Sequence, residues 1–314
     1  MNTYLALDLG GTKLLIGEID DQGNVLRHKK YESGYFNQPA ALEFIKQSLD
    51  DYIATVGWKK KPVAMGLGVI GRINPELGEW LQIDPKRTTP IPLAKELSKH
   101  YEMPCFIDND VKSATRAVQL FGLGKTSKNF IYINVGTGIA AGSVVNGQII
   151  RGGHFNAGEV GHTHSGLSLG IPCGCGRTDC VEQIASGIGF NTCARILREK
   201  YSTRLPIPVD PSYRVDVAEV FSLSRQEDPL CVQLVDNAAM ALANLIMNLT
   251  RMSDPEMIVL GGGIVSDGYL HAKILERLNP TTMRFVTNGV VLTKLNPNFI
   301  GLIGAGAVAI NETY

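Results

Sequence analysis

The chain has 314 residues and a mass of 34.0 kDa, and its 30 Lys and Arg residues balance its 30 Asp and Glu residues. A neutral chain lacks the basic surplus with which proteins bind nucleic acid backbones, so no nucleic acid partner is expected. The apolar fraction of 44% and the mean hydropathy of +0.04 exclude a mainly disordered chain, and the length predicts two domains.

The sequence also bears on membranes and on redox environment. No run approaches about 18 uninterrupted apolar residues, and the first residues lack the pattern of a signal peptide. Cys173, Cys175 and Cys180 crowd into one loop, whereas Cys105, Cys193 and Cys231 are isolated. This distribution favours a metal site and buried thiols over disulfides, so we expect a cytoplasmic protein without a membrane partner.

The first third of the chain reads as strands and helices in alternation. Residues 4–9 and 14–19 form apolar runs on either side of a glycine turn, which predicts a hairpin, and 25–31 predicts a third strand. Apolar residues recur at three- and four-residue spacing from 39 to 56, which predicts an amphipathic helix. We further expect elements as follows: strand 63–69, helix 93–101, strand 105–107 and helix 111–120.

The second part repeats the opening pattern, which indicates an internal duplication. Strand 130–135, a glycine turn and strand 139–145 again predict a hairpin, followed by an Asn-Gly turn. A helix from 231 to 252, a strand from 257 to 260 and a helix after Leu302 complete the prediction. This order is typical of a mixed α/β fold, with ligands outside the carboxyl ends of the strands and a domain boundary near Val111.

The two glycine hairpins are candidate phosphate sites. Gly10, Gly11, Thr12 and Lys13 form one, and residues 136–138 (Gly-Thr-Gly) form the other. Glycines let the backbone approach phosphate closely, and Asp8 at the first strand end suits Mg²⁺ binding through water. Each motif alone is equally compatible with a plain tight turn. Neither matches the P-loop or the dinucleotide-binding pattern, which disfavours those enzyme classes.

A second cluster predicts a metal. His162, Cys173, Cys175 and Cys180 supply one imidazole and three thiolates, the donor set of a closed tetrahedral zinc site. A closed shell indicates a structural Zn²⁺. We expect this metal to order the loop between Glu159 and Glu182, whose carboxylates suit sugar hydroxyls. The alternative is three free thiols in one loop.

Taken together, these motifs resemble the ROK family (repressors, open reading frames and sugar kinases) of the actin/hexokinase-like fold, nearly end to end. The matching segments are 8–13 (Asp-Leu-Gly-Gly-Thr-Lys), 109–110, 136–138, 157–162 (Ala-Gly-Glu-Val-Gly-His), 173–180, 181–183 and the glycines Gly261, Gly262 and Gly263. The resemblance implies two actin-like (ribonuclease H-like) domains with a cleft between them and a small zinc-binding loop, 162–180. We assign residues 1–111 to the first domain, with 301–314 as a candidate to complete it, and 112–300 to the second.

The resemblance also implies function. It implies a kinase that transfers the γ-phosphoryl group of Mg-ATP to a hexose hydroxyl, usually the one on carbon six, and works as a homodimer. By the same resemblance Asp110 is the catalytic base, and the sugar is bound by Asp110, Asn109, Glu159, His162, Glu182 and Gly71. ATP and its phosphates are expected at Asp8, Gly10, Gly11, Thr12, Lys13, Gly136, Thr137, Gly138, Gly261, Gly262 and Gly263. A competing interpretation makes Asp110 only a helix N-cap.

Departures from the family pattern leave the sugar open. The loop 68–71 lacks the usual proline, residues 80–84 lack a Pro-Asn pair, and Asp108 replaces the commoner Glu. Glucose, N-acetylhexosamines, fructose, allose and β-glucosides therefore remain candidate substrates. A sugar-sensing regulator is the remote alternative, because such proteins carry an N-terminal helix-turn-helix and here the phosphate hairpin begins within ten residues of Met1.

Overall fold

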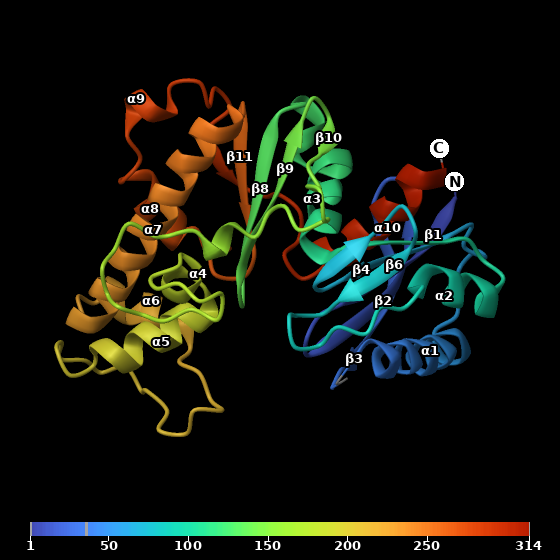
Figure 1. Cartoon of the computed structure of the whole chain (residues 1–314), viewed down its shortest axis with the longest axis horizontal. Coiled ribbons are helices and arrows are strands. Elements are labelled where there is room, and N and C mark those ends of the chain that lie inside the picture. The colour runs from blue at the N-terminus through green and yellow to red at the C-terminus, as the bar shows by residue number, and fades with distance from the viewer. Residues whose placement is uncertain (1, 35–36, 314) are drawn as a thin grey trace. The chain divides into compact units, whose positions relative to one another are not determined.

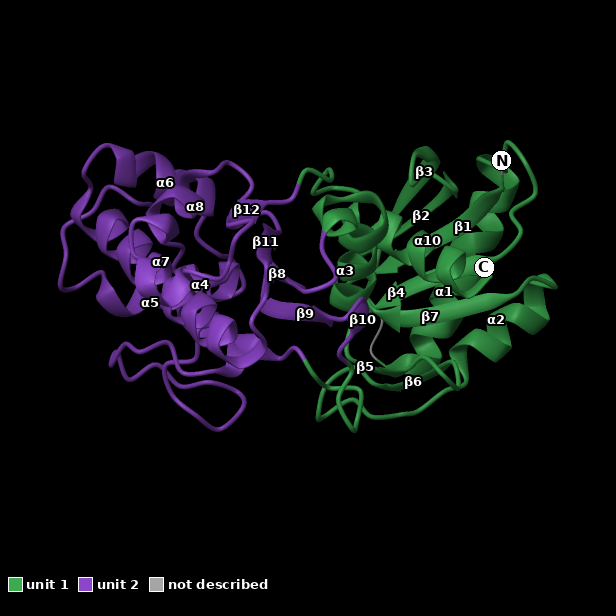
Figure 2. Ribbon diagram, turned by 90° about the horizontal axis from the view of Figure 1, so that it is seen from above, with its two compact units in different colours: residues 1–126, 151–157, 294–314 green, residues 127–150, 158–293 purple. Residues whose placement is uncertain are grey.

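The computed structural model describes residues 2–34 and 37–313, and its chain divides into two compact units. Unit 1 contains residues 1–126, 151–157 and 294–314, and unit 2 contains 127–150 and 158–293 (Figures 1 and 2). The chain therefore passes between the units four times. The sequence prediction placed the boundary near Val111, but the helix that begins there packs on the C-terminal helix and belongs to unit 1.

Unit 1 is built on a five-stranded sheet of order β3-β2-β1-β4-β7. Strands β1, β2 and β3 pair antiparallel, whereas β4 pairs parallel with β1 and with β7. The carboxyl ends of β1, β4 and β7 therefore lie at the same edge of the sheet. The strands are β1 (Thr3–Leu9), β2 (Lys13–Asp20), β3 (Val25–Glu32), β4 (Met65–Val69) and β7 (Cys105–Asn109), and a separate hairpin pairs β5 (Arg72–Asn74) with β6 (Glu79–Gln82).

Helices cover both faces of this sheet, because its central strand is apolar on both sides. Leu5 and Leu7 of β1 pack in a core with the first two helices, whereas Tyr4 and Ala6 pack against the last one. Such two-sided burial explains why the strand reads as a continuous apolar run. The helices of unit 1 are α1 (Gln38–Thr55), α2 (Leu93–Tyr101), α3 (Asp110–Phe121) and α10 (Ile300–Thr313), with the short turn η1 (Leu123–Thr126).

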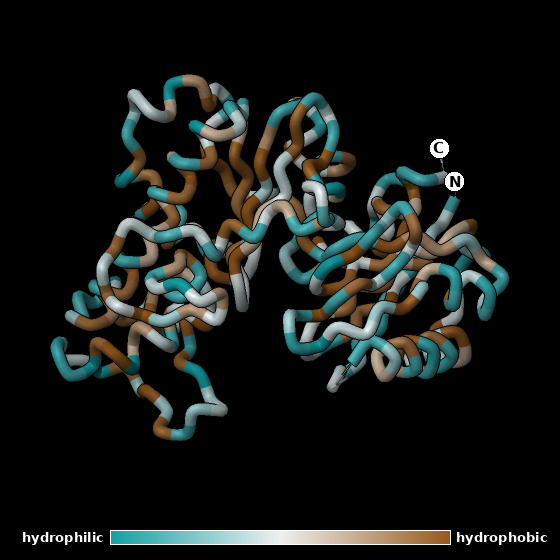
Figure 3. Tube along the Cα trace, viewed as in Figure 1, coloured by the Kyte–Doolittle hydropathy of each residue, from teal (hydrophilic) through white to brown (hydrophobic). Residues whose placement is uncertain are grey.

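Unit 2 repeats the strand order of unit 1, which confirms the duplication expected from the sequence. Its sheet runs β10-β9-β8-β11-β12, with an antiparallel hairpin β8–β9 and parallel pairs of β11 with β8 and β12. Figure 3 shows that the chain is mostly hydrophobic along β8, β9 and β11. The strands are β8 (Phe130–Val135), β9 (Ile139–Val145), β10 (Gln148–Ile149), β11 (Met257–Gly261) and β12 (Val290–Leu292).

Helix α7 (Pro229–Ser253) forms the centre of the unit 2 core. It is the one described helix long and apolar enough to cross a membrane, with a mean hydropathy of 1.5, but 67% of that stretch is buried inside the protein. Its apolar surface is therefore explained by core packing. The other helical elements are η2 (Val160–His162), α4 (Glu182–Ala185), α5 (Gly187–Leu197), α6 (Val217–Arg225), α8 (Tyr269–Leu275) and α9 (Pro280–Met283).

Candidate active site

The first glycine hairpin of unit 1 is a turn with an open outer side. The Gly10 amide donates to the Lys13 carbonyl at 2.9 Å, and this bond closes the turn between β1 and β2. Gly11, Thr12 and Lys13 are exposed, and a side chain added at Gly11 would meet no atom within 4 Å. The turn thus leaves space for a phosphate group beside its backbone and the Thr12 hydroxyl.

Asp8 lies at the end of β1, beneath this turn. A Cβ placed on Gly301, in the first turn of α10, would lie 2.3 Å from Asp8 Oδ2, so glycine is what allows the helix to approach the carboxylate. Burial raises the pKa of Asp8 to about 6, and the positive charge of Lys13 only partly opposes this. A cation bound here would compensate the carboxylate, and the site therefore fits the Mg²⁺ expected from the sequence.

The predicted base, Asp110, is the first residue of α3, at the carboxyl end of β7. The N-cap is Asn109, whose Oδ1 accepts from the amides of Val111 and Lys112 at 3.0 and 3.2 Å. The interpretation of Asp110 as only an N-cap is therefore wrong, because its neighbour fills that position. One carboxylate oxygen of Asp110 accepts from the Val111 amide at 2.9 Å.

Asn109 also connects this corner to the loop after β4. Its Nδ2 donates to the Gly71 carbonyl at 3.0 Å. Gly71 has φ +87, and a Cβ there would lie 2.1 Å from the Gln82 carbonyl oxygen, so only glycine fits. The structure thus brings Gly71, Asn109 and Asp110 together in unit 1, as predicted.

In unit 2 the second glycine hairpin is held by Glu182. Glu182 Oε2 accepts from the Ile139 amide at 2.8 Å, and a Cβ at Gly138 would lie 2.6 Å from the same oxygen. The Gly136 carbonyl in turn accepts from the Gly187 amide at 2.9 Å. Glu182 was predicted to bind sugar, and in the structure this oxygen of its carboxylate shapes the hairpin.

The four predicted zinc ligands meet in unit 2. Their ligand atoms all lie within 4.8 Å of one another. Cys173 Sγ is 3.4 Å from His162 Nδ1, and Cys175 Sγ is 3.6 Å from Cys180 Sγ. Donors around a tetrahedral zinc are separated by about 3.5–3.8 Å, so the arrangement fits such an ion. Burial and the neighbouring thiols raise the pKa of Cys180 to about 12, and a bound cation would lower it.

His162 faces two groups, one with each ring nitrogen. Nδ1 lies toward the thiol cluster, whereas Nε2 lies 3.9 Å from Glu159 Oε2. One imidazole therefore faces both the expected metal site and the carboxylate that is expected to bind sugar. Glu159 itself is exposed, which suits a ligand contact.

A cavity of about 360 Å³ in unit 2 contains part of the predicted nucleotide site. Gly136, Thr137 and Gly263 line it, as expected for the glycine turns. The sequence analysis missed its remaining lining residues, which are Gly187, Arg214, Val215, Val217 and Ile264. Their apolar side chains beside one guanidinium suit a planar base next to phosphates. No motif marks these residues, since they come from three separate segments.

The last glycine turn owes its composition to close packing. A Cβ at Gly261 would lie 2.4 Å from the Tyr132 hydroxyl, and one at Gly262, which has φ +94, would lie 2.3 Å from the Val135 carbonyl. Gly263 instead has no neighbour within 4 Å of such an atom. Of the three glycines, Gly263 is thus the one open to a ligand, and the other two position it.

Known proteins resemble this chain over most of its length. The ROK family model matches residues 4–312. A glucokinase of Halalkalibacterium halodurans is 29% identical over 272 residues, which are 84% of this chain and 81% of that protein. An N-acetylmannosamine kinase of Haemophilus influenzae is 32% identical over 276 residues, 85% and 82% of the two chains.

A solved structure shows the same similarity. The ROK hexokinase of Thermus thermophilus superposes with a TM-score of 0.75 at 27% identity, over 99% of both chains. The family match spans both glycine hairpins, the Asn109–Asp110 corner and the Cys/His cluster. The chain therefore belongs to the ROK family.

Proposed function

We propose that this chain, an ATP-dependent sugar kinase like its named relatives, transfers the γ-phosphoryl group of Mg-ATP to the 6-hydroxyl of a hexose. The observation that carries the proposal is the corner at the end of β7. There the carboxylate of Asp110 follows Asn109, whose amide is fixed on the Gly71 carbonyl. A carboxylate set beside a fixed amide suits a sugar hydroxyl that must lose its proton.

In the proposed reaction Asp110 accepts the hydroxyl proton as the sugar oxygen forms its bond to the γ-phosphorus. The bond from that phosphorus to the β,γ-bridging oxygen breaks, and ADP leaves. Each glycine hairpin, at residues 10–13 and 136–138, supplies a threonine hydroxyl and backbone amides to hold phosphate oxygens. The amides of Gly10 and Gly136 are not among them, because they close the turns. Mg²⁺, when bound near Asp8, would neutralise phosphate charge.

Within unit 1, we assign Asn109, Asp110 and Gly71 to sugar recognition. Within unit 2, we assign Glu159, His162 and Glu182 to it. His162 Nε2 lies 3.9 Å from Glu159 Oε2, which supports a shared role in binding one sugar. We assign Zn²⁺ a structural role, because His162, Cys173, Cys175 and Cys180 would supply four protein donors and leave no position for substrate.

The preferred sugar substrate can be identified by a kinase assay. Purified protein is assayed for ADP release with Mg-ATP and glucose, N-acetylmannosamine, N-acetylglucosamine, fructose, allose or a β-glucoside. We expect one of these hexoses to give the highest kcat/KM, its 6-deoxy analogue to give no turnover, and ³¹P NMR to place the product phosphate on carbon six. An Asp110→Asn sample prepared identically excludes a contaminating kinase. Absence of turnover on every sugar would overturn the proposal.

We also propose that the enzyme works in the cytoplasm as a homodimer. Free thiols at the Cys/His cluster fit that compartment, and Met240, which remains 39% exposed on α7, is available to an interface. Light scattering coupled to gel filtration measures the mass. A mass near 34 kDa at micromolar concentration would contradict the dimer.

A further inference from the structure

The seven residues 151–157 are part of unit 1, although the chain on both sides of them belongs to unit 2. We call this segment the strap. It ends at Ala157, the first residue of the family segment 157–162, and leads directly into Gly158 and Glu159. Neither the phosphoryl-transfer chemistry nor the metal site uses its residues.

The strap is a closed loop. The Ala157 amide donates to the Arg151 carbonyl at 3.1 Å, so its two ends are bonded to each other. Inside it the Phe155 amide donates to the Gly152 carbonyl at 3.3 Å, and both residues have positive φ, of +59 and +77. A loop whose ends are joined moves as one body when either end is held.

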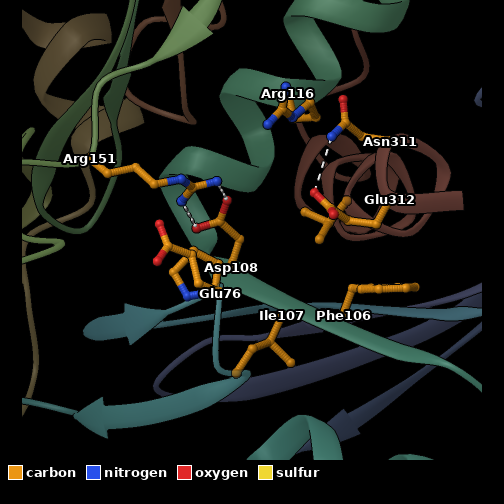
Figure 4. Close-up of a pocket in the computed structure, with 10 residues that line it drawn as sticks. Glu76, Phe106, Ile107, Asp108, Arg116, Arg151, Asn311 and Glu312 are labelled. Carbon is orange, nitrogen blue, oxygen red and sulfur yellow. Dashed lines mark hydrogen bonds and ion pairs between the residues drawn. The ribbon is translucent and has the colours of Figure 1, made fainter. Parts of the chain in front are cut away.

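One end is held by an ion pair. Arg151 Nη1 and Nη2 donate to Asp108 Oδ1 and Oδ2 at 2.7 and 2.8 Å, a bidentate arrangement (Figure 4). Only 3% of the Asp108 side chain is exposed, and its Oδ1 also accepts from the Asn109 amide at 2.8 Å. Two parallel bonds to a buried carboxylate fix the direction of the arginine as well as its distance.

The other end is held by a buried lysine. Lys112 Nζ donates to the Ala157 carbonyl at 2.7 Å, and Lys112 is 5% exposed. The Lys112 amide donates to Asn109 Oδ1, the N-cap of α3. An ammonium taken out of water needs oxygen acceptors, so this bond is costly to lose.

The two anchors stand on either side of the proposed base. Asp108 precedes Asp110 by two residues and Lys112 follows it by two, and both contacts reach the joined ends of one loop. We propose that Lys112, Asp108 and Arg151 are positioning residues, which through the strap fix both the first turn of α3 and the entry to the Gly158–Glu159 motif. This inference rests on the proposed roles of Asp110 and Glu159.

The chain beyond the strap is fixed equally closely. The Gly158 carbonyl accepts from the Ala141 amide at 2.8 Å, within unit 2. Gly158 has φ +103, and a Cβ there would lie 2.0 Å from the Ala141 carbonyl oxygen. The Gly158 carbonyl is therefore held within unit 2, and the Lys112 contact holds the Ala157 carbonyl within unit 1.

The main test is Lys112→Met, which keeps the length of the side chain and removes the ammonium. We expect the KM for sugar to rise about tenfold or more, as for loss of a hydrogen bond to a charged group, with the KM for ATP unchanged. Hydrogen exchange should become faster in peptides covering 105–115 and 150–160. The matched control is Lys95→Met, because it makes the same substitution at an exposed lysine of α2. It should change neither readout.

A second pair of variants covers the other anchor. Arg151→Gln alone leaves the buried Asp108 carboxylate without its arginine partner and risks misfolding. Asp108→Asn is therefore combined with Arg151→Gln, which keeps a neutral hydrogen-bonded pair. This double variant should reproduce the rise in the KM for sugar. The single variant Arg151→Lys keeps the positive charge, so its KM for sugar should rise less. Unchanged exchange and an unchanged KM for sugar in Lys112→Met would overturn the proposal, as would equal rises in both KM values. Failure of the proposed kinase function can be distinguished from failure of the strap proposal. Wild-type protein would then lack turnover, while the hydrogen exchange measurement would still test the strap.

Discussion

Asp8 is expected to lower the stability of the domain it serves. Its carboxylate lies under the first glycine hairpin and against the start of α10, where burial raises its pKa to about 6 from the ordinary value of 3.8. A raised pKa means that the folded state favours the protonated acid. At neutral pH the ionised group therefore opposes folding, and Asp8→Asn, which removes the charge at similar size, should stabilise unit 1.

The expected magnitude follows from linkage. With pKa values of 3.8 unfolded and about 6 folded, the penalty is about 3 kcal/mol at pH 7 and about 1.5 kcal/mol at pH 5. It disappears below the unfolded pKa, because the group is then protonated in both states. The stability gained by Asp8→Asn should therefore shrink steadily as the pH falls from 7 to 4.

The chain offers a probe of unit 1 alone. Its two tryptophans, Trp58 and Trp80, both lie in that unit, and Trp80 is fully buried. Urea unfolding followed by tryptophan fluorescence, without Mg²⁺ or nucleotide, therefore compares the variant with the wild type at several pH values. Asp21→Asn, in the turn after β2, is the control and should change stability by less than about 0.5 kcal/mol.

Two results would refute this reasoning. One is a variant less stable than wild type at pH 7, and the other is a stability difference that does not change with pH. The same variant should lose most kinase activity, because the amide is a poor ligand for the proposed Mg²⁺. Gain of stability together with loss of activity is the pattern expected of a functional group held in an unfavourable place.

Three further predictions concern single residues. Asp110→Asn keeps an acceptor for the Val111 amide but cannot take a proton, so turnover should fall by about 10²–10⁴-fold with sugar binding retained. Glu96→Gln, in the first turn of α2, is the control. Near-normal turnover of Asp110→Asn would reject Asp110 as the base. Metal analysis should find about one zinc per chain, lost in Cys175→Ala and kept in Cys193→Ala, whose thiol lies in α5 outside the cluster; full zinc in the first variant would reject the ligand set. Gly66→Ala places a Cβ 1.9 Å from the Ala305 carbonyl oxygen and should destabilise unit 1 by about 1–3 kcal/mol or more. Gly11→Ala adds a Cβ with no atom within 4 Å, so it should leave thermal stability unchanged while it impairs catalysis. Equal melting temperatures of the two variants would contradict the packing argument.

Local signals made much of the molecule predictable from its sequence. Apolar runs interrupted by glycine predicted the hairpins at residues 10–13 and 136–138, because a tight turn needs residues without a Cβ. Close spacing predicted that Cys173, Cys175 and Cys180 would lie together, since a short loop limits their separation. Periodicity located the central helix of unit 2, which begins at Pro229 and ends at Ser253, within two residues of the prediction at each end.

Contacts between distant segments escaped prediction. Asp108 and Arg151 are 43 positions apart, and nothing in either neighbourhood indicates that they pair. The same holds for Lys112 with Ala157, and for Arg214, which joins the cavity of the second glycine hairpin from a loop with no recurring pattern. Such pairs depend on tertiary packing alone. Assignment of the strap to unit 1 depended on them and could not be predicted.

The C-terminal helix has a consequence for the order in which the chain becomes folded. Helix α10, the last element, completes one face of the sheet that begins with β1, and Leu302, Ala305 and Ala309 share a core with Tyr4 and Ala6. A nascent chain leaving the ribosome therefore exposes that face until Ile300–Thr313 has been made. The residues of unit 2, by contrast, are all synthesised before residue 294. We expect unit 2 to fold first during translation and unit 1 to fold last, with its apolar sheet a target for chaperones in the interval.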